Sequence, residues 1–116
     1  MSWWVHLCGS DGEPLAVRSH VKGGTYCAGE CDEADLNITY NYSKFYHEHL
    51  DKEEGLRWLN GKIASDCIER LEAAVKALGT ERDGDYWKPT AGNAGHALNI
   101  LLSWAKQNPS GIFGVN

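Results

Sequence analysis

Apolar residues recur at helical spacing in two long stretches of the second half of the chain. Between residues 62 and 79 they return every three or four positions, which predicts an amphipathic helix that ends at Gly79. Between residues 91 and 109 a second apolar face predicts another helix, which ends before Pro109. The apolar positions are Ile63, Cys67, Ile68, Leu71, Ala74, Val75 and Leu78 in the first stretch and Ala94, Ala97, Leu98, Leu101, Leu102 and Ala105 in the second. Each predicted helix has one apolar stripe and needs one partner layer.

The first half of the chain alternates between apolar and polar residues, as strands do. Residues 2–8 and 13–21 flank Asp11-Gly12, a pair that suits the positive backbone angles of a tight turn, so an N-terminal hairpin is predicted. Residues 34–42 form the clearest strand. Its apolar face, expected to meet the core, is Leu36, Ile38, Tyr40 and Tyr42, and its polar face, expected to look away from the core, is Asn37, Thr39 and Asn41.

Two further strands are predicted in stretches where the alternation of apolar and polar residues is less regular. Residues 21–35 are rich in glycine and in acidic side chains, which predicts a short strand around Thr25 to Cys27 and then a loop. Residues 111–116 are long enough for a last strand that returns to the edge of the sheet.

Two short helical pieces are predicted between the strands and the long helices. Ser43 is expected to cap a helix that starts at Lys44, and Asp51 with Glu54 has the capping-box spacing for a second one. The order of elements is therefore strands, helices and a terminal strand. This order predicts an α+β fold: a small, mostly antiparallel sheet with an N-terminal hairpin and a C-terminal strand, covered on one face by two main helices and the short helical pieces.

The composition agrees with a single domain over residues 1–116. With 42% hydrophobic residues, a chain of this length can build one core without metal or disulfide staples. Its formal charge of -5 disfavours a broad phosphate-binding surface, so general nucleic-acid binding is not expected. No run approaches the ~20 apolar residues of a membrane span, and the start of the chain lacks the pattern of a signal peptide. We therefore expect a cytoplasmic protein without membrane association and without disulfides.

The cysteines are the candidates for metal binding or covalent catalysis. Cys27 and Cys31 have a CxxxC spacing on a glycine-containing loop, and Cys8 or His6 is able to complete a tetrahedral zinc site. A second compact ligand pair is missing from the sequence, so buried thiols are the favoured interpretation and no metal or other cofactor is expected. The carboxylates beside Cys27 and Cys31 disfavour a reactive thiolate. No catalytic residue is assigned.

The junction between the predicted strand 34–42 and the helix after it gathers many hydrogen-bonding groups. A second helix start, at residues 90–96, has Gly92 and Gly95 to allow close approach of a ligand, and aromatic residues stand just before it. We therefore predict a ligand site formed by the two helix starts, with the residues Asn41, Tyr42, Ser43, Trp87, Thr90, Asn93 and His96. The alternative is that these polar residues only cap helices, while the glycines and aromatics serve packing.

Adjacent tryptophans on the first strand point to a second surface. Trp3 and Trp4 must face opposite sides of a sheet, so at least one is expected to be exposed unless both faces are covered. An exposed aromatic on a sheet suggests an interface, such as that of a homodimer.

A resemblance to known proteins is carried by the stretches "NITYNYSKFY", "GLRWLNGK", "RLEAAVKALGT", "DYWKPTAGNAGHALNILLSWAKQNP" and "IFGVN". These stretches resemble a group of small phage, prophage and bacterial proteins. The resemblance covers about the last two-thirds of the chain and is weakest over residues 21–35. It implies a compact α+β protein often carried by mobile elements, and it implies no particular reaction.

The function predicted from the sequence is that of a binding protein. A phage origin favours a non-enzymatic protein that captures a host protein or a small anionic, nucleotide-like ligand in the host cytoplasm, and such capture is expected to serve the inhibition of a host system. Two alternatives stay open. One is a small enzyme acting on a nucleotide-like substrate, with Asn41, Asn93 and His96 as its polar groups. The other is a structural component that assembles with copies of itself.

Overall fold

The N-terminal strand lies at the centre of a three-stranded antiparallel sheet in the computed structural model, which describes residues 1–21 and 30–116. β1 (Ser2–Cys8) pairs on one side with β4 (Asp35–Thr39) and on the other with β5 (Ile112–Val115). The predicted C-terminal strand is therefore confirmed, and it lies at the edge of this sheet. The strand predicted around Thr25 to Cys27 lies outside the described residues.

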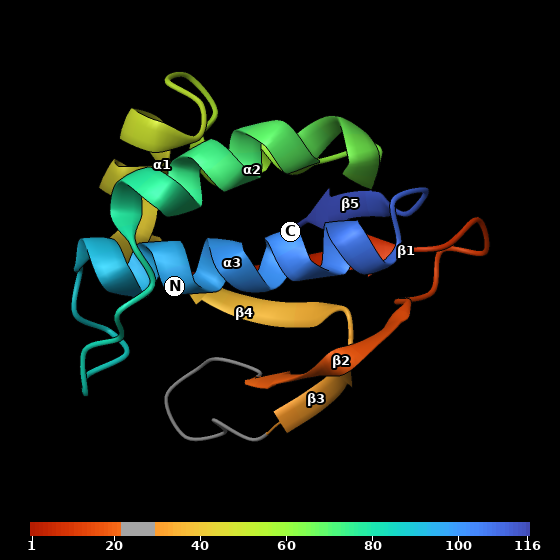
Figure 1. Cartoon of the computed structure of the whole chain (residues 1–116), viewed down its shortest axis with the longest axis horizontal. Coiled ribbons are helices and arrows are strands. Elements are labelled where there is room, and N and C mark those ends of the chain that lie inside the picture. Colours follow the sequence, from red (N-terminus) through yellow and green to blue (C-terminus); the bar gives the residue numbers. More distant parts are fainter. Residues whose placement is uncertain (22–29) are drawn as a thin grey trace.

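The two faces of β1 have different surroundings. Trp3, Val5 and Leu7 are buried, whereas Trp4, which points the other way, is 41% exposed. α2 (Ala64–Leu78) and α3 (Ala91–Gln107) pack against each other on the buried side of the sheet, and α3 lies over the sheet roughly along the direction of β4 and β5 (Figure 1). The α+β fold is therefore confirmed, and so is the exposure of one of the two adjacent tryptophans.

The core lies between the sheet and these helices. The largest fully buried side chains include Trp104, Tyr42, Tyr46, Phe113, Leu71 and Leu101. The apolar stripe predicted for α2 is confirmed at Cys67, Leu71, Ala74 and Leu78. Ile63 was wrongly placed on that stripe: it precedes α2, forms an isolated β-bridge with Ile112 and is 46% exposed.

The N-terminal hairpin is present, with pairing only close to its turn. Gly9 N donates to O of Glu13 (3.0 Å), and Leu15 N donates to O of Leu7 (2.9 Å). Beyond Leu15 the chain leaves β1, and β2 (Ala16–Val21) pairs with β3 (Glu30–Glu33) in a separate two-stranded sheet (Figure 1). The loop predicted over residues 30–33 is therefore wrong. The backbone groups of β2 need a partner, and this pairing outweighs the weak strand propensity of acidic residues.

β4 ends at Thr39, earlier than the alternation predicts. Thr39 Oγ1 accepts a hydrogen bond from Asn41 N (3.2 Å) and so caps the 3-10 helix η1 (Tyr40–Tyr42). Because this cap turns the chain, Tyr40 and Tyr42 are not strand residues, contrary to the prediction. α1 (Ser43–His49) follows directly. Ser43 is already its first residue, and Tyr42 holds the cap position without a side-chain bond, so the cap predicted at Ser43 is wrong.

Asp51 organises the turn after α1. Its Oδ2 accepts hydrogen bonds from Glu53 N (3.1 Å) and Glu54 N (2.8 Å). This turn leads into η2 (Gly55–Leu59), so the second short helical piece is confirmed and is a 3-10 helix.

Candidate functional site

The strand-to-helix joint, defined here as residues 37–43 and the loop 82–90 that lies against them, is held by hydrogen bonds between its two segments. The Asn41 side-chain amide donates to O of Trp87 (2.8 Å). The Tyr42 hydroxyl donates to O of Tyr86, and the Tyr86 hydroxyl donates in turn to O of Asn37 (2.5 Å). Burial, and then the neighbouring Tyr86, raise the pKa of Tyr42 well above its usual value, so its hydroxyl stays protonated and able to donate.

The polar face of β4 is buried, whereas the sequence predicted that it looks away from the core. Asn37 is 6% exposed and Thr39 is 1% exposed. Asn37 Nδ2 donates to Oγ of Ser2 (2.7 Å) and to O of Trp3 (3.3 Å), so the neighbouring strand supplies its partners. The Thr39 hydroxyl is used in the cap of η1. These two side chains therefore bond within the fold.

Asn93 ties the loop to the start of α3. Its Oδ1 accepts from Asp83 N (2.8 Å), and its Nδ2 donates to O of Asp85 (3.1 Å) and O of Lys88 (2.9 Å). The cap of α3 is Thr90, whose Oγ1 accepts from Asn93 N (3.1 Å). Asn93 is buried, and its side chain makes three bonds to one loop. Its observed role is to fix the conformation of that loop.

The glycines at the start of α3 make room for the protein's own backbone. A Cβ on Gly92 would overlap the carbonyl oxygen of Glu81, and a Cβ on Gly95 would overlap the carbonyl oxygen of Gly79. The segment 79–81 thus occupies the space in which a ligand was predicted. The expectation that these glycines open the helix start is wrong, and close packing of two backbone segments explains them.

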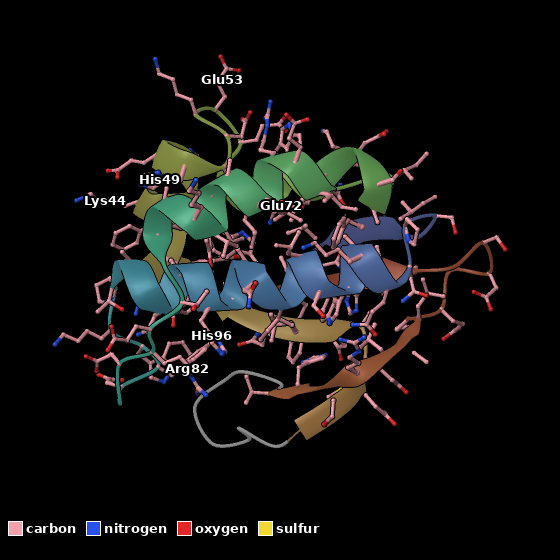
Figure 2. The ribbon with its side chains drawn as sticks, in the orientation of Figure 1. Lys44, His49, Glu53, Glu72, Arg82 and His96 are labelled. Carbon is pink, nitrogen blue, oxygen red and sulfur yellow. The ribbon has the colours of Figure 1, made fainter. Side chains whose placement is uncertain are left out.

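An open depression of about 420 Å³ lies at the start of α3 and is lined by Leu78, Gly79, Glu81, Arg82, Asp83, Thr90 and Gly92. His96 borders a much smaller cavity at the joint. Its volume is about 20 Å³, which is room for one water molecule rather than for a nucleotide-like ligand. The cavity is lined by Val21, Leu36, Tyr42, Arg82, Tyr86, Asn93, His96, Ala97 and Ile100. Figure 2 shows Arg82 and His96 close together beside α3. Burial, followed by the charge of Arg82, lowers the pKa of His96, which favours its neutral form.

The structure thus brings most of the predicted site residues together and bonds them to one another. Asn41, Tyr42, Trp87 and Asn93 meet through the backbone of the loop, Thr90 caps α3, and His96 lies beside the cavity. Ser43 is half-buried at the start of α1. Arg82 and Tyr86 were not predicted, because their roles depend on how the loop folds back. Ligand binding at the joint remains a prediction. The side chains of Asn41, Tyr42 and Asn93 have partners inside the chain, whereas the buried Nε1 of Trp87 has none among the described residues.

The cysteines of the described residues are free thiols. Cys67 is buried on α2, and burial raises its pKa to about 11, as expected for a packed thiol. Burial, followed by Glu13 and Asp11, also raises the pKa of Cys8. Within residues 1–21 and 30–116, no three potential metal ligands of the His, Cys, Asp and Glu types come together. The CxxxC candidate includes Cys27, which lies outside the described residues.

A second surface lies on the side of the sheet opposite the helices. We define the outer sheet face by Trp4, His6, Cys8, Ile112 and Gly114, which alternate with the buried residues of β1 and β5. Trp4 is 41% exposed and Ile112 is 44% exposed. His6 pairs with Asp35 of β4 and with Gly114 of β5, and its Nδ1 lies 3.4 Å from Oδ1 of Asp35. This face therefore combines exposed apolar groups with one close contact between His6 and Asp35.

Comparison with known proteins found no matching family model, no matching curated protein and no matching solved structure. Across the described ranges, none of the helices has the length and apolar character needed to cross a membrane.

Proposed function

We propose that this protein is a non-enzymatic binding protein whose contact surface is the outer sheet face. The observation that carries the proposal is the exposure of Trp4 (41%) and Ile112 (44%) on the same face of one small sheet. Tryptophan gives up a large apolar area when it is covered, and aromatic anchors dominate the binding energy of protein interfaces.

The shape of this surface favours a protein partner over a small molecule. Small-molecule sites are concave and surround most of the ligand, whereas a β-sheet presents a broad surface to another surface. At the joint, by comparison, the cavity beside His96 has a volume of about 20 Å³, the depression of about 420 Å³ at the start of α3 is open to solvent, and the side-chain amides of Asn41 and Asn93 are already bonded. A protein partner at the outer sheet face would cover apolar area that the fold leaves exposed to solvent.

The class of partner follows from the resemblance of the chain to small phage and prophage proteins. For a protein of that kind, a host protein or a second copy of the same chain is a suitable partner, and capture of a host protein would inhibit a host system. The outer sheet face is the proposed contact in both cases, and its Trp4 is the proposed anchor.

Site-specific photo-cross-linking in a bacterial cell tests this proposal. A photoreactive amino acid replaces Ile112 in one variant and Arg18, an exposed residue of β2, in the control variant. We expect a discrete cross-linked product from position 112 and none from position 18. Excess unlabelled wild-type protein should compete the product away, and excess Trp4→Ser protein should not. Equal labelling from both positions, or no competition, would reject the outer sheet face as the contact surface.

A further inference from the structure

Gly114 is a glycine that the isolated chain does not require. Other described glycines either have positive φ values or lie so close to a neighbouring group that a Cβ would crowd it. The first set is Gly12, Gly55, Gly61 and Gly79, and the second is Gly9, Gly92, Gly95 and Gly111. Gly114 belongs to neither set, because its φ is not positive and nothing lies within 4 Å of its Cβ position. Gly84 shares this property, but it lies in a polar loop.

A glycine inside a strand weakens the strand, and it often marks a place where another group approaches closely. Gly114 lies on β5 opposite His6, so its missing side chain leaves a gap in the outer sheet face. No described group of the chain fills this gap within 4 Å. If a partner places a side chain over Gly114, this contact explains why the strand has a glycine at that position.

Trp4 is a projecting side chain beside this gap. Trp4 and Asn116 exchange backbone hydrogen bonds (3.0 and 2.9 Å), and Gly114 is two residues from Asn116, so Trp4 and Gly114 are diagonal neighbours on one face. Diagonal neighbours of this kind lie about 7–8 Å apart. The outer sheet face thus presents a large projecting group and a matching gap side by side.

We propose that a second copy of this chain binds here face to face. The two copies are related by a two-fold axis that lies above the sheet and parallel to it, and that passes over the midpoint of the line from Trp4 to Gly114 at right angles to this line. Such an axis exchanges the two positions, so Trp4 of each copy covers Gly114 of the other. This inference rests on the proposed use of the outer sheet face as a contact surface, and it identifies the partner. The exposed Ile112, next to Gly114 along the same face, extends the apolar contact.

The distribution of charge permits this like-on-like contact. Each chain has a formal charge of -5, so two copies repel unless the contact avoids their acidic groups. Asp35 borders the outer sheet face, and its Oδ1 lies 3.4 Å from Nδ1 of His6, while Trp4, Cys8, Ile112 and Gly114 carry no charged side chain. Asp32 and Glu33 are on β3, in the other sheet. The proposed contact between Trp4 and Gly114 therefore joins side chains without charge.

Complementary variants of the purified full chain test the pairing directly. Trp4→Gly removes the projecting group, and Gly114→Trp fills the gap. We expect wild-type protein to dimerise reversibly in sedimentation velocity experiments, and each variant alone to associate at least about tenfold more weakly. A mixture of the two variants should regain association, because one Trp-over-Gly contact forms on each side of the two-fold axis. Arg18→Thr, on an exposed strand position of the other sheet, is the matched control and should dimerise like wild type.

Three outcomes separate this inference from the proposed function. Recovery of dimers in the mixture supports the pairing of Trp4 with Gly114. A wild-type chain that stays monomeric to about 1 mM overturns the inference, and it leaves the proposed function intact if the cross-link from position 112 still forms with another protein. Monomers together with no cross-link overturn both. The side chain introduced by Gly114→Trp projects into open space, so this variant still tests the pairing if Trp4→Gly weakens β1. Circular dichroism and denaturant midpoints verify that both variants are folded.

Discussion

The strand-to-helix joint and the outer sheet face differ in how far their side chains already have partners inside the chain. At the joint, Asn41, Tyr42 and Asn93 all bond to the backbone of the loop 82–90. On the outer sheet face, Trp4 and Ile112 keep much of their apolar surface exposed, and the space above Gly114 is open. The hydrogen-bonding residues of the joint therefore bond largely within the fold, whereas the exposed apolar area and the unfilled gap are the features on which the proposed contact surface rests.

The energetics of the two regions explain the difference. A ligand at the joint must replace hydrogen bonds that already exist, so its net gain is small, and a buried group left unpaired costs about 1–3 kcal/mol. Covering the outer sheet face removes apolar area from water at about 25 cal/mol per Å², with no bond to break first. These magnitudes favour the outer sheet face over the joint as the proposed site of binding.

Asn93→Ala should produce the largest effect, because it removes three side-chain bonds from the joint. We expect the free energy of unfolding to fall by about 2–4 kcal/mol, while self-association of the folded protein stays unchanged. Urea denaturation and sedimentation of the same samples provide both values. Asn99→Ala, at an exposed position of α3, is the matched control and should change stability by less than about 0.5 kcal/mol. Lost binding of a partner with unchanged stability would instead make the joint a ligand site.

Alanine at two glycines should have effects of opposite sign. Gly95→Ala places a methyl group against the carbonyl oxygen of Gly79, and we expect a loss of about 2–3 kcal/mol in unfolding free energy. Gly114→Ala enters open space on a strand, so in dilute monomer it should gain about 0.4–1 kcal/mol. Chemical denaturation at low protein concentration measures both. A clear destabilisation by Gly114→Ala would mean that the fold itself requires this glycine, and the comparison between the two regions would then fail.

His96 should give the smallest effect, seen as a dependence of stability on pH. Its pKa is lowered in the folded state, so between pH 7 and pH 5 the unfolded chain takes up a proton more readily than the folded one. The stability contributed by neutral His96 is therefore present above the unfolded pKa of about 6.5 and is lost as the pH falls. We expect wild-type protein to lose less than about 1 kcal/mol more than His96→Gln over this range, since the ring is partly exposed. Identical pH profiles for the two proteins would show that His96 is solvated like an exposed histidine.

The long helices could be predicted from the sequence because their signals are local. The apolar repeat of Cys67, Leu71, Ala74 and Leu78, and the terminating Gly79, each depend on neighbours within a few turns. The last strand and its place at the edge of the sheet were also predicted, but its partner was not: β5 pairs with β1 from the far end of the chain. Pairing partners such as β2 with β3 depend on tertiary geometry that alternation does not encode.

The errors at the candidate site have a common physical cause. Thr39 was read as one more alternating strand residue, but its hydroxyl caps η1 and ends the strand. Asn93 and the glycines of α3 were read as groups facing a ligand, because the sequence does not show that residues 79–90 fold back over them. Trp4 was predictable from strict alternation with Trp3, and Gly114 carried a signal that was overlooked: a glycine between apolar residues of a short strand.

The central place of β1 also has a consequence for the order of events during protein synthesis. Val5 lies opposite Val115, so β1 cannot acquire its second neighbour until residue 115 has left the ribosome. At ~5–20 residues per second, that delay is roughly 5–20 s. Throughout this time the strand that carries Trp3, Val5 and Leu7 has an open edge, which is the kind of surface that other chains can pair with. Translation therefore sets a lower limit on the time in which the sheet closes.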